Sequence, residues 1–179
     1  YKTAVTDAFR DAGQKTEAQI VLPAGYNSAA VISDMPDATH FMLSGNYGES
    51  GYQYSGKMDI LGKILTSKYV NPTLRGRYGA YGASVFFDAT GMTCAATGLQ
   101  DIDIAVEVWN GMGDFLRDIE ITQKEIEAVT VPAVKEFDEY YNDSDYGATL
   151  KYSEKTAEDI KRTRDEMLSV TPEDLKGYA

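Results

Sequence analysis

Apolar residues in much of the chain recur at the three- and four-residue spacing typical of helices that bury one face. Within residues 57–71 this apolar set is Met58, Ile60, Leu61, Ile64 and Leu65. The pattern predicts a helix here, and Pro72 is expected to end it because the residue before a proline avoids helical backbone. The same spacing over residues 4–9 predicts an opening helix that ends at Gly13.

After Gly98 the pattern predicts helices almost to the last residue. Asp101 can cap one helix whose apolar face carries Ile104, Val108, Met112, Phe115 and Leu116. Thr122 and Glu125 have the spacing of a capping box and predict a second helix to about Tyr140, with Pro132 as an interruption. The chain breaks at NDSDYG, residues 142–147, and further helices are predicted over 155–170 and from Thr171 onward.

Shorter apolar runs separated by turn residues predict strands. QIVLP (19–23) and NSAAVISDM (27–35) flank a turn, and THFMLSG (39–45) is a third strand or a crossing loop. GASVFFD and GMTCAATG bracket residues 89–91 as a hairpin, whereas GNYGESGYQYSG (45–56) is typical of a loop. This order predicts an α+β fold with a mostly antiparallel sheet and helices packed on one face.

Length and charge restrict the class of protein. The 179 residues suit one domain, and 17 basic against 28 acidic residues make a nucleic-acid surface improbable. No apolar stretch approaches the roughly 20 residues of a membrane helix, so no membrane partner is expected. The first residue is Tyr1, and the chain resembles a piece of a larger polypeptide. The expected location is cytoplasmic, although the absence of a signal peptide says little about a piece of a larger polypeptide.

Common catalytic constellations are missing from the sequence. A catalytic zinc site needs three protein ligands, but His40 is the only histidine and is expected to be an ordinary surface or core residue. Cys94 is the only cysteine, and its apolar neighbours predict a buried structural thiol. No glycine-rich loop has the lysine of a phosphate-binding motif. The sequence therefore predicts no metal ligand and no catalytic residue within this chain.

The stretch LRGRYGAYGASVFFD (74–88) combines cationic and phenolic side chains with glycines. A guanidinium and a phenol both donate hydrogen bonds to a peptide carbonyl, and to the oxyanion that a carbonyl becomes during hydrolysis. Glycines beside tyrosines are also common where a chain turns tightly into a strand. Taken alone, the stretch leaves both interpretations open.

The order of motifs resembles one family. The phrases LTSKYVNPTLRGRYGAYGASVFFDATG, EVWNGMGDFLRDIEIT and MLSVTPEDLKGYA are similar to the C-terminal part of presequence-protease-type members of the pitrilysin/insulinase zinc metallopeptidases. The resemblance runs from about Glu17 to the end, so it implies a single peptidase-family domain over 17–179, preceded by a linker or helix remnant over 1–16. Residues 96–100 lack the arginine that the family usually has after the hairpin, and the family would continue beyond Ala179.

The resemblance implies a division of labour within a longer enzyme. Zinc and the catalytic glutamate would belong to the N-terminal half of the same polypeptide, and the substrate would be an unstructured peptide. Arg75 and Tyr81 would contact that peptide and stabilise the oxyanion, while Arg77 and Tyr78 have no assigned role. Six residues of extended chain span roughly 20 Å, which is too far for Arg75 and Tyr81 to reach one carbonyl easily. The link between them is therefore expected to bend, at Gly76 and Gly79.

Two other functions stay open. The parent can be a non-catalytic homologue that serves assembly or substrate capture, because the decisive ligands lie elsewhere. Alternatively, the chain is a free-standing α+β binding module whose 45–56 loop displays tyrosines to a protein partner. In all three cases the isolated chain is expected to be inactive as a peptidase.

Overall fold

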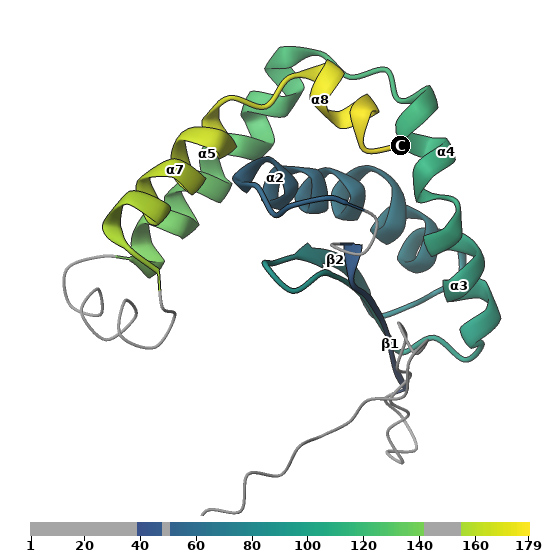
Figure 1. Ribbon diagram of the computed structural model, residues 1–179. Coiled ribbons are helices and arrows are strands. Elements are labelled where there is room, and N and C mark those ends of the chain that lie inside the picture. Colours follow the sequence, from purple (N-terminus) through teal and green to yellow (C-terminus); the bar gives the residue numbers. More distant parts are fainter. Residues whose placement is uncertain (1–38, 48–50, 142–154) are drawn as a thin grey trace, which may run out of the picture.

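The computed structural model describes residues 39–47, 51–141 and 155–179. Helices pack over one face of a small antiparallel sheet, and the predicted α+β class is confirmed (Figure 1). The predicted helix over 1–13, the predicted strands 19–23 and 27–35 and the predicted break at 142–147 lie outside the described residues.

Three strands in the described part of the chain form the sheet. They are β1 (His40–Gly45), β2 (Gly82–Phe87) and β3 (Met92–Thr97), in the order β1-β3-β2, with both pairs antiparallel. THFMLSG is therefore a strand, and the predicted hairpin is confirmed. Its turn is closed by the Asp88 carboxylate, which accepts hydrogen bonds from the backbone N–H groups of Thr90 and Gly91 at 2.7 and 3.1 Å.

The helix predicted to stop at Pro72 continues beyond it. Helix α2 (Gly56–Leu65) runs directly into two π-helical segments, η2 (Thr66–Val70) and η3 (Pro72–Arg77). Asn71 keeps helical backbone angles, and its N–H reaches back five residues to the carbonyl of Thr66. The prediction was wrong because a proline in the first turn of η3 needs no intrahelical N–H partner there.

The remaining helices follow the predicted order. They are α3 (Ile102–Asn110), α4 (Met112–Asp118), α5 (Gln123–Tyr140), α7 (Ala157–Leu168) and α8 (Pro172–Gly177). The predicted capping box of Thr122 and Glu125 is present, and α5 continues through Pro132 without interruption. Among the described residues, no helix is long and apolar enough to cross a membrane.

The single helix predicted after Asp101 is in fact two. It divides at Gly111, where a Cβ atom would lie 2.4 Å from the hydroxyl oxygen of Tyr69. The Tyr69 ring stacks on Phe115 of α4 with ring centroids 4.8 Å apart. The bend at Gly111 therefore lets α4 pack against the π-helical region without a steric clash.

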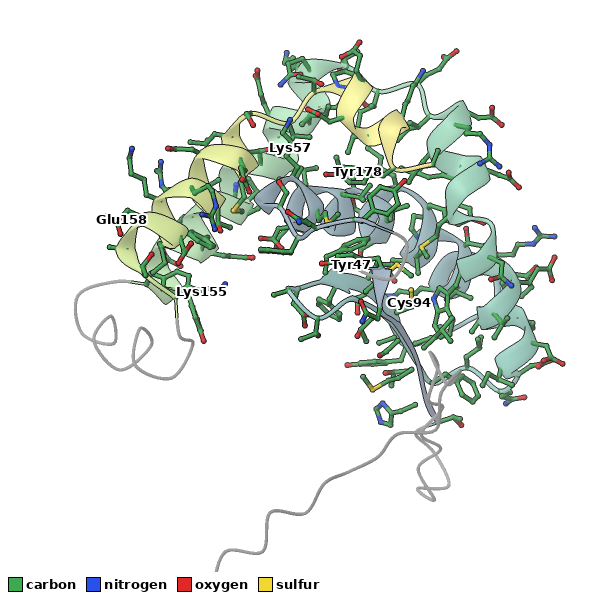
Figure 2. The ribbon with its side chains drawn as sticks, in the orientation of Figure 1. Tyr47, Lys57, Cys94, Lys155, Glu158 and Tyr178 are labelled. Atoms are coloured by element: carbon green, nitrogen blue, oxygen red, sulfur yellow. The ribbon has the colours of Figure 1, made fainter. Side chains whose placement is uncertain are left out.

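Helix α2 occupies the centre of the fold. It contacts β2 on one side and the neighbouring helices α5 and α7 on the other (Figure 1). Its apolar face buries Ile60, Ile64 and Leu65 almost completely, opposite Val85 and Cys94 of the sheet. The predicted burial of Cys94 is confirmed (Figure 2), and desolvation raises the pKa of this thiol to about 12.

The start of α2 is held by side chains from the last two helices. The Glu166 carboxylate accepts hydrogen bonds from the Ser55 hydroxyl at 3.0 Å and from the Gly56 N–H at 2.7 Å. Lys57 forms an ion pair with Asp174 of α8, with 2.7 Å between Nζ of Lys57 and Oδ1 of Asp174. Because a carboxylate is favourable at a helix N-terminus, Glu166 stabilises α2 while it joins α2 to α7.

Gly56 allows the close approach of α2 and α7. A Cβ atom at this position would lie 2.1 Å from the carbonyl oxygen of Thr163. We predict that Gly56→Ala lowers the free energy of unfolding by roughly 2–3 kcal/mol, because the two helices must separate to admit the methyl group. Denaturant unfolding measures the change.

The matched control for this substitution is Gly76→Ala, where no atom lies within 4 Å of the added methyl group. This variant is expected to keep or raise stability by up to about 1 kcal/mol, because alanine favours helical backbone. Equal destabilisation of the two variants would contradict the packing described for Gly56.

Capping gives the fold an acid-sensitive element at the start of α5. Backbone and side-chain hydrogen bonds from Thr122, together with Lys68 2.9 Å away, lower the pKa of Glu125 to about 2. A lowered folded-state pKa adds stability above the unfolded value, and that stability is lost as the pH falls toward 2. We therefore expect Glu125→Gln to lose less stability than the unmodified chain between pH 5 and pH 2, as measured by thermal unfolding. Identical pH profiles would refute this.

Candidate functional site

The candidate site lies where η3 ends and β2 begins. Tyr78 closes the helical segment, and Gly79 follows with a φ of +76°, in the left-handed region that glycine adopts readily. The Ala80 N–H then donates to the Leu74 carbonyl at 2.9 Å. Leu74 and Ala80 are both buried, whereas residues 75–79 are exposed. The chain is thus pinned at two points and turns back on itself between them.

This geometry corrects the expectation of a link that bends at both glycines. Residues 75–77 are helical, and Gly76 has no left-handed backbone; the reversal occurs at Gly79 alone. The connection is compact because the helix continues past Pro72. The chain doubles back as predicted, but helix continuation and one left-handed residue produce the reversal.

Arg75 and Tyr81 lie one residue beyond the two pinned positions. The hydrogen bond between Leu74 and Ala80 brings their backbones into the same region. Both side chains are exposed, with Tyr81 at 82% exposure. Neither side chain forms a hydrogen bond or ion pair with another described residue. The two donors are therefore accessible from solvent, and their action on one ligand stays a prediction.

The backbone of Tyr81 is fixed although its ring is exposed. Its N–H donates to the Thr97 carbonyl at 2.8 Å, which extends the β2–β3 pairing by one residue. Gly98 follows with a φ of +74°, and a Cβ atom there would lie 3.1 Å from the Cβ of Tyr81. The end of the hairpin therefore sets the direction in which Tyr81 leaves the sheet.

Arg77 and Tyr78 occupy the exposed turn between the two candidate residues. The guanidinium carbon of Arg77 lies 5.3 Å from the centre of the Tyr78 ring, in cation–π contact. Their side chains thus interact with each other. The sequence assigned them no role, and they provide matched controls of the same residue types.

The described residues do not suit a zinc ion. They contain no group of three or more His, Cys, Asp or Glu side chains placed to hold a metal. His40 is exposed on β1, with its Nδ1 atom 3.1 Å from the Thr97 hydroxyl. Cys94 is fully buried, and its raised pKa keeps the thiol protonated at neutral pH.

The tyrosines of the 45–56 segment are attached to the domain. The Tyr47 hydroxyl donates to the Asp88 carbonyl, and the Tyr54 hydroxyl donates to the Asp59 carboxylate at 2.7 Å. The Tyr52 ring lies 6.4 Å from that of Tyr178, between centroids. These contacts argue against a loop that displays tyrosines to a partner. The pairing of Tyr54 with Asp59 was not foreseen from the sequence.

A comparison with known families identifies the family of this α+β domain. The family described as the PreP C-terminal domain matches residues 31–179, and the chain belongs to this family. The match begins inside the predicted domain, so the predicted boundary between residues 16 and 17 stays a prediction.

Relatives are longer proteins. The chain is 24% identical to presequence protease 1, chloroplastic/mitochondrial, of Arabidopsis thaliana, over 76% of this chain and 13% of that protein. It is 27% identical to protein HypA of Clostridium perfringens, over 75% of this chain and 14% of that protein. A mitochondrial presequence protease of Schizosaccharomyces pombe is 24% identical over 87% of this chain and 16% of its own length. The chain therefore spans only a small part of these relatives.

Two glycines around Tyr81 test how the site is held. Gly79 and Gly98 share a left-handed φ, but only Gly98 has atoms near the position of an added Cβ. We predict that Gly79→Ala costs roughly 1 kcal/mol of stability, from backbone strain alone. Gly98→Ala is expected to lower stability by more than this and to shift Tyr81, since the added methyl group both strains the backbone and presses on Tyr81.

Denaturant unfolding gives the two stabilities, and NMR shifts of the Tyr81 ring report its displacement. Gly79→Ala serves as the control for strain. An unmoved Tyr81 signal in Gly98→Ala would show that the hairpin end does not orient this residue.

Proposed function

We propose that this chain is the substrate-binding C-terminal domain of a zinc-dependent endopeptidase that encloses and cleaves unstructured peptides. In this proposal Arg75 and Tyr81 contact the peptide backbone. The observation that carries it is the closed turn between Leu74 and Ala80, which presents both side chains to solvent from one region. Membership of the PreP C-terminal domain family supports it.

The chemistry of the two side chains fits this role. A guanidinium keeps its charge at all physiological pH values and donates through a planar fork, while a phenol donates a single directed hydrogen bond. Both can bind the carbonyl oxygen of the scissile peptide in the ground state. As that oxygen gains negative charge, both hydrogen bonds strengthen, which lowers the barrier to hydrolysis.

Zinc and the general base would come from the N-terminal half of the same polypeptide, which is also the expected partner of this domain. Zinc would supply Lewis acidity at the scissile carbonyl. The present chain would bind and orient the peptide, and alone it is expected to be inactive. The cytoplasmic location stays a prediction, and three relatives are instead named as mitochondrial or chloroplastic/mitochondrial presequence proteases.

A non-catalytic homologue that captures peptides would use the same two residues without hydrolysis. The tyrosine contacts with Asp88, Asp59 and Tyr178 make the free-standing display module the less favoured alternative. Peptide cleavage by the polypeptide that contains this chain separates the catalytic proposal from mere capture.

The role of Tyr81 can be tested by removing one hydroxyl group. In the polypeptide that contains this chain, we predict that Tyr81→Phe lowers kcat for peptide cleavage about a hundredfold, or roughly 3 kcal/mol of transition-state stabilisation. The ring is 82% exposed, so no loss of folding is expected.

Tyr78→Phe is the matched control, because Tyr78 is an exposed tyrosine of the same turn. It is expected to cleave at the normal rate. Unchanged turnover in Tyr81→Phe, or an equal loss in both variants, would remove the proposed role.

A further inference from the structure

A cavity of about 760 Å³ lies between α2, α5 and the far end of β2. Its residues from β2 are 84–87, whereas Tyr81 precedes the start of the same strand. Ser84 is the cavity residue of β2 nearest to Tyr81 along the strand, roughly 10 Å away at 3.3 Å per residue. Neither Arg75 nor Tyr81 lines the cavity. This cavity is therefore separate from the candidate site around Arg75 and Tyr81.

Asp59 is the charged group of interest in the cavity. Its carboxylate is half-buried in the first turn of α2 and accepts the hydrogen bond from Tyr54 at 2.7 Å. Among the described residues, no basic side chain forms an ion pair with it. Burial raises the pKa of the Asp59 carboxyl, against the lowering effects of Tyr54, Lys155 and Lys63. The negative charge is thus only partly compensated.

Aromatic rings form much of the surrounding wall. Phe86 and Tyr140 are 58% and 65% exposed, and Phe137 and Tyr141 pack with ring centroids 4.8 Å apart. The ammonium nitrogen of Lys155 already lies 5.9 Å from the centre of the Tyr54 ring. Figure 2 shows Lys155 beside the start of α7. The wall therefore already attracts one cation of the chain itself.

Other charges around the cavity are compensated locally. Lys63 pairs with Glu136 at 2.5 Å, and the Asp88 carboxylate binds Thr90 and Gly91 in the hairpin turn. Lys155 forms no ion pair with a described residue, and it contacts the Tyr141 hydroxyl at 3.4 Å. The Asp59 carboxylate can therefore attract a positively charged ligand, and the Lys155 ammonium group repels it.

We propose that this cavity binds the guanidinium group of an arginine in a peptide, which pairs with Asp59 and stacks on the exposed aromatic rings. A planar guanidinium suits this site better than an ammonium. It stacks on aromatic rings, and it can donate two parallel hydrogen bonds to one carboxylate. The cavity is large enough for an arginine side chain beside Lys155. The inference concerns binding alone and does not require that Arg75 and Tyr81 act in cleavage.

The test uses a fluorescent hexapeptide with one arginine and its citrulline analogue, which keeps the shape but lacks the charge. Binding to the polypeptide that contains this chain is measured by fluorescence anisotropy. The arginine peptide is expected to bind about tenfold more tightly than the citrulline peptide. Asp59→Asn, which still accepts the Tyr54 hydrogen bond, should abolish that preference.

Lys155→Gln should increase the affinity for the arginine peptide about threefold, because it removes a positive charge that repels the guanidinium. The affinity for the citrulline peptide should not change. Asp103→Asn is the matched control: this exposed carboxylate on α3 does not line the cavity, and its loss should change neither affinity. Phe86→Leu, on an exposed ring, should weaken the arginine peptide even if Asp59→Asn folds poorly.

Equal binding of the two peptides overturns the proposal, as does a preference that survives Asp59→Asn or Phe86→Leu. Weaker binding of the arginine peptide to Lys155→Gln overturns it as well. Cleavage is not the readout, so loss of activity in Tyr81→Phe neither supports nor removes this site.

Discussion

The contact between the central helical segment and the outer edge of β2 determines where the candidate residues lie. The Val85 N–H donates to the Thr66 hydroxyl at 2.9 Å, and a Cβ atom on Gly62 would lie 2.8 Å from the Val85 carbonyl. The helix therefore covers an edge that would otherwise expose unpaired backbone groups. Once strand and helix are joined in this way, their connection must be short, and residues 75–81 have to reverse direction at once.

The two ends of the segment have different roles. At the start of α2, Glu166 and Asp174 join the helix to α7 and α8 through half-buried hydrogen bonds. At the other end, the chain is held by the Leu74–Ala80 hydrogen bond and by burial of Leu74, and residues 75–79 between these two positions are exposed. A domain with one anchored end and one exposed end of its central helix is well suited to present Arg75 to a ligand.

Much of the fold follows from local patterns. Capping residues such as Thr122 and Thr171 predicted helix starts because the side-chain bonds that they make are local. The failures concern tertiary contacts. Pro72 was expected to end a helix, but burial of Val70 and Leu74 on either side favours continuation. Gly111 breaks a regular apolar pattern because Tyr69, far away in sequence, occupies the space.

The two candidate sites also differ in how far they could be predicted from the sequence. Arg75 and Tyr81 could be proposed from the sequence because of its resemblance to a family, although the geometry of their link could not. The cavity around Asp59 has no motif, since its walls come from α2, α5 and β2 and meet only in the folded chain. The net charge of the chain, −11, likewise gives no indication that one half-buried carboxylate forms no ion pair with any residue that the structure describes.

The claim that matters most is that a guanidinium and a phenol serve one carbonyl oxygen together. A double-mutant cycle on peptide cleavage, with Arg75→Ala, Tyr81→Phe and the two combined, measures this directly. If both residues act on the same oxygen, the fold decrease in kcat of the double variant should be much smaller than the product of the fold decreases of the two single variants. Losses that multiply fully would show that the two residues act on separate groups and would contradict the account.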